Sequence, residues 1–303
     1  MSSGQLRSQV SGALWIPRGV TIDDIPALVE DFITRRTTNA QAGFDSSTAK
    51  AMVDGVPHGG TAALLQPYCD HNRAPGDIGE LHIQPEVLTQ LAIELDAQGF
   101  ALHLHVMGDR GVRVALDAIE AARIMNGTRN GGPRHHLAHV TMVHADDVGR
   151  FGALGVTANI QALWAAPDPG LIPMIGEQRA AESYLFRAMV DSGADIAMGS
   201  DWPVSPPTPW DAIHTAVNRT HPMVPPEAGR LDPRQALTLQ ESLAAYTAGS
   251  ASLVFGTSGR LRVGEIANLA LADNNPFAID PFQLAGITNL VTIVNGKIVY
   301  RAA

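Results

Sequence analysis

Residues 100–122 read FALHLHVMGDRGVRVALDAIEAA, and this stretch decides the fold class. Its first part, residues 100–106, is a short and mostly apolar run that predicts a strand. In its second part, apolar residues recur at the spacing of one helix face until Asn126-Gly127 ends the pattern. A strand that leads directly into a helix is the repeating unit of a parallel α/β sheet.

The same alternation continues on both sides of this stretch. Strands are predicted at residues 9–16, 137–143, 156–162 and 195–200, and helices at 21–36, 84–99, 146–154 and 179–192. Strands that alternate with helices indicate the α/β class, and the pattern is compatible with a barrel.

The pattern changes in the last quarter of the chain. A long helix is predicted at residues 237–255, where Thr238 and Glu241 form a capping box. Two β segments follow, at 260–273 and 290–301, and Asn295-Gly296 in the second is typical of a type I′ hairpin turn. We therefore expect a small β appendage at the end of the chain.

The composition excludes several classes of protein. The chain has 303 residues with 21 Lys and Arg against 30 Asp and Glu, and its net charge of −9 disfavours nucleic acid as a partner. Cys69 is the single cysteine, so no internal disulfide forms. No apolar run is long enough for a membrane span, and the first residues do not resemble a secretory leader, so we expect a cytoplasmic protein.

Four polar residues stand near the ends of short apolar runs. These are Lys50, His105, His139 and Asp201. In a parallel barrel the carboxyl ends of the strands converge on one face, and imidazole and carboxylate groups suit zinc and similar ions. A lysine joins such a site only as a carbamate. Each residue also has a simpler interpretation: a hydrogen-bonded core histidine, a helix-capping aspartate or a solvated lysine.

Several motifs, taken together and in order, resemble the amidohydrolase superfamily, in its branch of YtcJ-like proteins and N-substituted formamide deformylase (Amidohydro_3 type). The motifs are KAMVDG at 50–55, GTAALLQPY at 60–68, HLHVMGDR at 103–110, HHLAH at 135–139, GSDWPV at 199–204, TAGS at 247–250 and GRLRVGEIANL at 259–269.

The resemblance implies a metal-dependent hydrolase with a (β/α)8 TIM barrel, in residues 1–256, and a β-sandwich segment of a flanking domain, in 257–303. It implies that Lys50 is the carboxylated lysine of strand 4, and that His105 and His139 are the ligands of strands 5 and 6. Asp201 is then the strand 8 aspartate, which acts as general base and then general acid.

The resemblance also implies residues on the substrate side of the site. Asp109 and Arg110 orient His105 or meet substrate, although Asp109 equally fits a helix cap. Tyr68 lines the pocket or packs in the core. Gln161 and Trp164 stand where relatives often show Gln-Pro-x-His, so a substrate-side histidine is replaced.

One family feature has no counterpart in this sequence. No His-x-His pair precedes Lys50, and the segment from His103 to Asp201 is too short for the seven βα steps that would make His103 and His105 that pair. We therefore expect an incomplete barrel, made of about strands 3 to 8, that holds at most one tightly bound divalent ion, Zn²⁺. The open sheet edge favours a second copy or a complementing chain as a partner.

The sequence thus predicts an amidohydrolase, a hydrolase of carbon–nitrogen bonds other than peptide bonds, with an N-substituted amide or formamide as substrate. Two alternatives stay open. One is a catalytically impaired remnant of the family or half of a split enzyme, and the other is a metal-dependent esterase or lactonase.

Overall fold

The structure is a computed structural model that describes residues 8–127, 132–254 and 259–302. The chain forms two compact units. The larger unit comprises residues 12–160 and 168–196, and the smaller unit comprises 1–11, 161–167 and 197–303. The predicted domain boundary at 256/257 lies outside the described residues.

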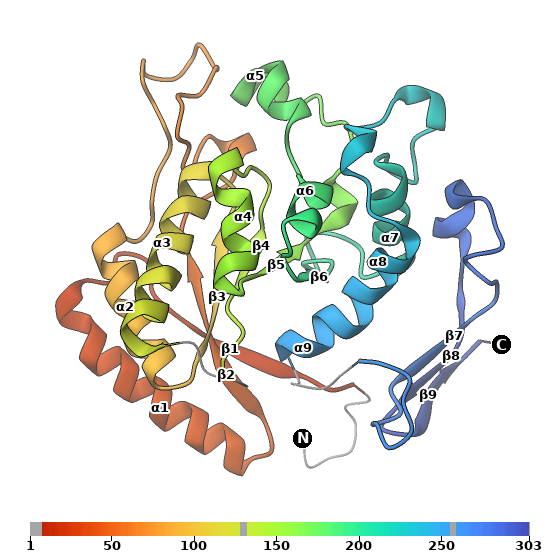
Figure 1. Cartoon of the computed structure of the whole chain (residues 1–303), viewed down its shortest axis with the longest axis horizontal. Helices are drawn as coiled ribbons and strands as arrows, with labels where there is room; N and C mark the ends of the chain where they lie inside the picture. The colour runs from red at the N-terminus through yellow and green to blue at the C-terminus, as the bar shows by residue number, and fades with distance from the viewer. Residues whose placement is uncertain (1–7, 128–131, 255–258, 303) are drawn as a thin grey trace. The chain divides into compact units, whose positions relative to one another are not determined.

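Strands and helices alternate through the larger unit, as the sequence predicts (Figure 1). The strands are β1 (Ser11–Trp15), β2 (Asp45–Met52), β3 (Ala101–Val106), β4 (His136–His139), β5 (Thr157–Ile160) and β6 (Ile196–Met198), of which β6 continues into the residues of the smaller unit. The helices are α1 (Ile25–Gln41), α2 (Pro85–Ala97), α3 (Asp109–Asn126), α4 (Ala145–Leu154), α5 (Ile172–Ala181) and α6 (Phe186–Asp191). The strands form one sheet in the order β1-β2-β3-β4-β5-β6, and β2 to β5 pair in parallel, which confirms the α/β class.

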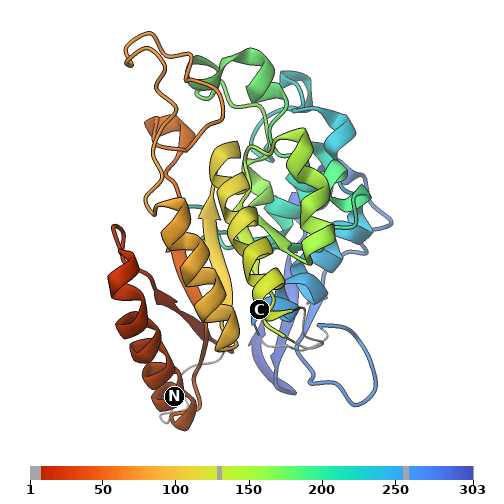
Figure 2. The ribbon, with the colours of Figure 1, turned by 60° about the vertical axis from the view of Figure 1, so that its left-hand side comes forward.

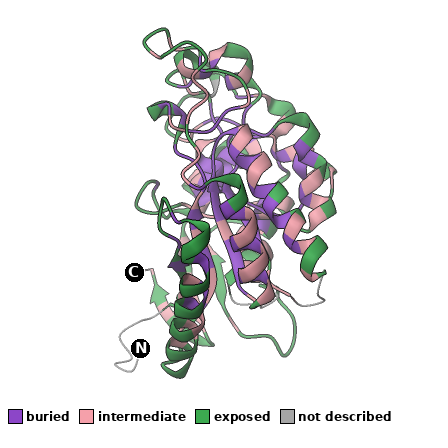
Figure 3. Cartoon of the chain, turned by 90° about the vertical axis from the view of Figure 1, so that its left-hand side faces the viewer, coloured by how far each residue is buried: buried purple, intermediate pink, exposed green. Residues whose placement is uncertain are grey.

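One face of this sheet is apolar and carries the helices. Figure 2 shows α1, α2 and α3 side by side along it, and Figure 3 shows buried residues on the strands and on the inner sides of the helices. The fully buried residues of this core include Ala49, Ala51, Leu91, Leu95, Leu104, Val112, Leu116, Ile119 and Leu137. Burial of a leucine or isoleucine side chain contributes roughly 1.5–3 kcal/mol, so this layer supplies much of the unit's stability.

The opposite face of the sheet is polar. Lys50 of β2 lies opposite His103 of β3, His103 opposite His136 of β4, and His136 opposite Thr157 of β5. Paired residues in a sheet point to the same side, so these four side chains form one row across the unit. The candidate site builds on this row.

The smaller unit contains the predicted β appendage. Its sheet has the antiparallel order β7 (Leu269–Ala272), β8 (Asn289–Val294) and β9 (Lys297–Arg301). Asn295 and Gly296 between β8 and β9 have φ of 50° and 75°, as the type I′ turn requires. Elsewhere in this unit, α7 (Pro209–Asn218) packs its Trp210 and Ile213 with Leu284 and Ile287.

The structure corrects four predicted elements. The prediction of one helix at 179–192 is wrong, because α5 and α6 are separate. Between them, Tyr184 takes φ of 57° and donates its N–H to the Thr141 carbonyl at 2.8 Å. The strand predicted at 260–273 is limited to β7. The strand predicted at 137–143 ends at His139, where φ is 75°.

The helix predicted at 237–255 is also interrupted. It consists of α8 (Leu239–Ala244), a π-helical turn (Ala245–Gly249) and α9 (Ser250–Val254), and the capping box of Thr238 and Glu241 is present. Within the described ranges, every helix is too short or too polar to cross a lipid bilayer.

A buried hydrogen bond between a neutral histidine and a carboxylate ties the helices to the amino-terminal ends of the strands. His135 Nε2 lies 3.0 Å from Asp96 Oδ1 in α2, and His135 Nδ1 accepts the Leu102 N–H at 3.1 Å. Asn126 of α3 donates to the same carboxylate at 2.9 Å. Burial alone would raise the pKa of Asp96, but the hydrogen bonds of His135 and Asn126 and the charge of Arg123 outweigh it, and the pKa is lowered.

This pair predicts a specific loss of stability. Asp96→Asn should lower the free energy of unfolding at pH 7 by about 3 kcal/mol, because a buried charged acceptor is removed from its partners. A carboxylate with a lowered pKa stabilises the folded state above its ordinary value of 3.8 and loses that effect as the pH falls through the folded pKa. The difference between the two proteins should therefore close below pH 3.8 in urea titrations.

Asp195→Asn is the matched control for Asp96→Asn. Asp195 is an exposed carboxylate that pairs with Arg134 at 3.2 Å. Its substitution should change the free energy of unfolding by less than about 0.5 kcal/mol. Equal losses in the two variants would contradict the role of the buried pair.

Candidate functional site

Two predicted ligands, His105 and His139, come together at the carboxyl ends of β3 and β4. Their ring centroids lie 4.5 Å apart with an interplanar angle of 67°. Each residue is 5% exposed, so both rings are largely shielded from water. Two adjacent imidazoles at the ends of parallel strands are a suitable start for an ion site.

The backbone of His139 explains this contact. His139 pairs with Val106 in the sheet, and successive residues of a strand point to opposite faces, so regular strand geometry would direct His139 away from His105. Instead, His139 and Val140 take φ of 75° and 51°, in the left-handed region. This conformation is unfavourable for both residue types and ends β4. Its consequence is that the imidazole turns toward His105.

Lys50 lies one layer deeper on the same face of the sheet as His105. It is in register with His103, while Met52 is in register with His105. His103 contacts His136 with ring centroids 4.5 Å apart. The structure therefore brings the predicted ligands of β2, β3 and β4 to one face of one unit.

The imidazoles beside Lys50 stay uncharged at neutral pH. Burial lowers the pKa of His136 to about 4 and that of His103 well below its usual value, and the positive charge of Lys50 acts in the same direction. His136 Nδ1 lies 3.2 Å from the Arg134 carbonyl, which only accepts, so Nδ1 carries the proton. Lys50 therefore faces neutral rings.

Asp54, absent from the predicted site residues, lies next to His105. Its side chain is fully buried, and its Oδ1 is 3.4 Å from His105 Nδ1. The sequence signal was the motif at 50–55, in which Asp54 reads as a turn residue after a strand. Burial of a carboxylate beside an imidazole is what distinguishes it, and only the fold shows this.

Asp109, Arg110 and Tyr68 use their polar atoms within the protein. Asp109 Oδ1 accepts the Leu65 N–H at 2.8 Å and the Arg110 N–H at 3.0 Å, at the start of α3. Arg110 donates to the Gly79 carbonyl at 3.0 Å, and the buried Tyr68 hydroxyl donates to the Ala62 carbonyl at 2.8 Å. These contacts anchor the loop after β2, and a substrate contact remains a prediction for all three.

Asp201, Gln161 and Trp164 belong to the smaller unit. Asp201 follows β6 and is exposed, with φ of 55°. Gln161 is buried, and the Trp164 indole N–H donates to Ser205 Oγ at 2.6 Å. Their part in a site with the residues of the larger unit is a prediction.

The side chains of His105 and His139 fit a divalent ion if Lys50 is present as a carbamate. Among the described residues, no three His, Cys, Asp or Glu side chains are grouped to hold an ion. The two imidazoles of His105 and His139 supply nitrogen ligands, so a third protein ligand requires Lys50 as a carbamate. Nδ1 of His105 is buried without a hydrogen bond of normal length and lies 3.4 Å from Asp54 Oδ1.

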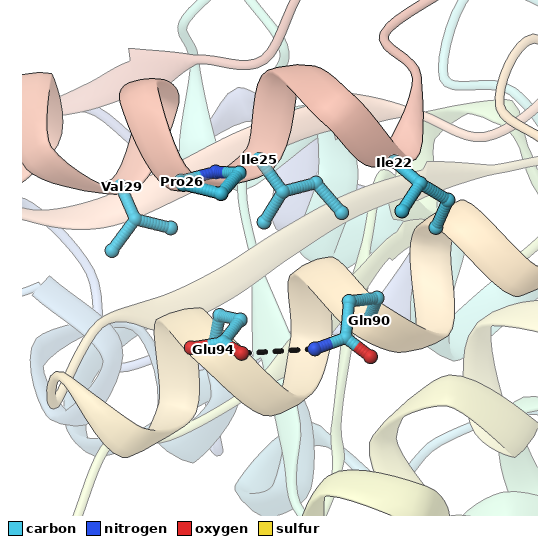
Figure 4. Close-up of a pocket in the computed structure, with 6 residues that line it drawn as sticks. All are labelled: Ile22, Ile25, Pro26, Val29, Gln90 and Glu94. Atoms are coloured by element: carbon cyan, nitrogen blue, oxygen red, sulfur yellow. Dashed lines mark hydrogen bonds between the residues drawn. The ribbon is translucent and has the colours of Figure 1, made fainter.

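A hollow between α1 and α2 offers no such chemistry (Figure 4). Its volume is about 490 Å³, and α1 and the turn before it contribute Ile22, Ile25, Pro26 and Val29. Glu94 of α2 is the only charged group in its lining and accepts a hydrogen bond from Gln90 at 2.9 Å. The hollow therefore lacks a cluster of ligating or nucleophilic side chains.

Comparison with known proteins agrees with the sequence motifs. A family model described as the amidohydrolase family matches residues 17–300. The chain is 28% identical over 257 residues to the putative amidohydrolase YtcJ of Bacillus subtilis, covering 83% of this chain and 46% of YtcJ. It is 26% identical over 242 residues to N-substituted formamide deformylase of Arthrobacter pascens, covering 76% of this chain and 42% of that protein.

A solved structure shows the same fold. An uncharacterized metal-dependent hydrolase of Pyrococcus furiosus aligns with a TM-score of 0.63 and 24% identity, covering 83% of this chain and 47% of that chain. The chain thus spans less than half the length of these curated relatives and of this structure.

The left-handed turn at His139 predicts an unusual order of stabilities. His139→Gly should be more stable than His139→Ala by about 1 kcal/mol, because glycine takes a positive φ without steric cost. At the neighbouring strand position the order should reverse, with Ala138→Gly destabilising by about 0.5–1 kcal/mol. Urea unfolding in the presence of a metal chelator measures both, and a less stable His139→Gly would refute the turn geometry.

Proposed function

The chain belongs to the amidohydrolase family, and from this membership we propose that it hydrolyses a non-peptide C–N bond, in an N-substituted amide or formamide, with the help of a divalent ion. The observation that carries the proposal is the contact of His105 and His139 at the carboxyl ends of adjacent parallel strands. The similarity to N-substituted formamide deformylase supports the substrate class.

His105, His139 and a carbamate on Lys50 would hold a single ion, Zn²⁺. All three side chains come from one face of the larger unit, and their two imidazoles are 5% exposed. The chemistry that such an ion would supply is a bound water with its pKa lowered toward about 7, which makes hydroxide available at neutral pH.

Lys50 stands in surroundings that suit a carbamate. Reaction of its amine with carbon dioxide forms an N–C bond and releases one proton, and converts a cation into an anion. The neutral rings of His103 and His136 lie in the same row of the sheet. Neutral imidazole is a hydrogen-bond donor at one nitrogen, and the Arg134 carbonyl takes the proton of His136, so His103 is the ring of this row that offers a donor to a carbamate oxygen.

Asp201 would move the proton. Its carboxylate accepts a proton from the attacking water and passes it to the amine nitrogen as the C–N bond breaks, which yields a carboxylic acid and an amine. The same attack cleaves esters, so an esterase or lactonase activity is an outcome of the substrate test below.

The metal proposal predicts the following binding results. The purified chain should bind one Zn²⁺ with high affinity, as measured by elemental analysis after dialysis. His105→Ala, His139→Ala and Lys50→Gln should each abolish tight binding, since each removes one of three protein ligands. Two tightly bound ions per chain would contradict the single-site assignment, and a chain that binds none would favour a catalytically impaired remnant.

Asp201→Ala should separate binding from turnover. We expect it to keep the bound Zn²⁺ and to lose activity by a factor of about 10²–10⁴ on a panel of formamides, amides and esters, the usual contribution of a general acid–base group. Activity unchanged by the substitution would remove Asp201 from the mechanism.

We also propose that a second copy of the chain covers the free edge of β1. Among the described residues β2 is the only strand neighbour of β1. The strand contains no charge and no proline, and Trp15 at its end is 48% exposed. Natural edge strands usually carry such features to prevent pairing, so their absence favours association.

This association predicts a dimer in solution. Light scattering after size exclusion should give twice the mass of the chain, and Trp15→Lys should convert the dimer to a monomer. Ile124→Lys, which replaces an exposed apolar residue of α3, is the matched control and should leave the dimer intact. A monomeric wild-type protein would rule out the second copy.

A further inference from the structure

The Asp54 carboxylate is fixed from two segments of the larger unit. Oδ2 accepts the N–H of Ala63 at 3.0 Å and that of Gly108 at 2.8 Å, while Oδ1 accepts the N–H of Met107 at 3.0 Å. Three backbone donors leave the group little freedom to rotate. The carboxylate therefore joins the loop after β2 to the loop between β3 and α3.

Oδ1 of the same carboxylate faces the ring of His105. The distance of 3.4 Å to Nδ1 is longer than a normal hydrogen bond, and Nδ1 is otherwise buried without a partner. Because a carboxylate only accepts, the favoured tautomer carries its proton on Nδ1 and its lone pair on Nε2.

We infer that Asp54 is a positioning residue: it orients His105 and fixes the tautomer whose Nε2 binds the ion. The inference depends on the proposed function, because it assigns His105 as a ligand. A histidine ligand that donates its other N–H to a carboxylate is held in one orientation and is a stronger base, which tightens metal binding.

The pair of Asp96 and His135 provides the contrast within the same unit. It is equally buried, but its histidine uses both nitrogens: Nε2 with Asp96 and Nδ1 with the Leu102 N–H. No lone pair is left for an ion. This pair also lies at the amino-terminal ends of the strands, whereas Asp54 and His105 lie at the carboxyl ends, where α/β barrels place their chemistry.

Gly111 of α3 offers a way to move Asp54 without removing its charge. A Cβ at this position would lie 2.7 Å from Asp54 Oδ2 and 2.9 Å from its Cγ, so Gly111→Ala must displace the carboxylate. Gly149 of α4 is the matched control, because a Cβ there meets no atom within 4 Å. Both substitutions favour the helix equally, since alanine has the higher helix propensity.

The experiment titrates Zn²⁺ into the metal-free full chain at constant pH by calorimetry, for the wild type and four variants. Asp54→Asn and Gly111→Ala should weaken binding by about 10- to 100-fold, the usual effect of losing such a partner. Asp96→Asn and Gly149→Ala should bind within about twofold of the wild type. Circular dichroism and the urea midpoint report the folding of each variant.

The outcomes distinguish the positioning role of Asp54 from the proposed function, in which His105 is a metal ligand. Wild-type affinity in both Asp54→Asn and Gly111→Ala would overturn the role of Asp54 and leave the proposed function intact. A wild-type chain that binds no Zn²⁺ overturns both. Asp54→Asn leaves backbone donors unpaired, so if this variant does not fold, the Zn²⁺ affinity of Gly111→Ala decides alone. If Asp96→Asn weakens Zn²⁺ binding as much as the Asp54 variant does, the effect is a general one of stability, and the inference is overturned.

Discussion

In-register pairing of β2, β3 and β4 is the constraint on which the candidate site depends. Pairing places Lys50, His103 and His136 in one row and His105 one layer above them, although these residues lie far apart in the sequence. A shift of one residue in any pair would send the side chains of that strand to the helix side. The apolar residues that alternate with them, such as Ala51 and Leu104, prevent that shift because they must stay buried.

The backbone conformation and the buried charge of the candidate site lower the stability of the fold, and other contacts in the larger unit offset this loss. A left-handed conformation at His139 and Val140 costs roughly 1–2 kcal/mol per residue. The buried Asp54 carboxylate is stabilised by three backbone N–H groups. The Asp96 and His135 pair holds α2 and α3 against the other end of the sheet. In β4 the strain thus lies at the carboxyl end, where the candidate ligands meet, and the hydrogen bonds at the opposite end supply rigidity.

The sequence predicted those helices and turns whose formation depends on neighbouring residues in the chain. Apolar periodicity located α2, α3 and α4, and Asn295-Gly296 located the hairpin of β8 and β9. The break between α5 and α6 was missed because it depends on the hydrogen bond from Tyr184 to Thr141, a tertiary contact. The motifs identified His105 and His139 as candidate metal ligands. The reversal of the His139 side chain and the burial of Asp54, however, follow from how the strands pack. No spacing rule in one sequence contains that information.

The sheet has a further consequence for how the polypeptide acquires its structure. Spatial order follows chain order from β1 to β6, so each strand finds its neighbour one helix away. Each step then closes a single βα unit, and loop-closure entropy grows only slowly with the length of that unit. Each βα unit is able to dock on the preceding one as the nascent chain leaves the ribosome. The imidazoles of β3 and β4 come from consecutive βα units, so their contact requires the closure of one such unit and not the segments that follow β4.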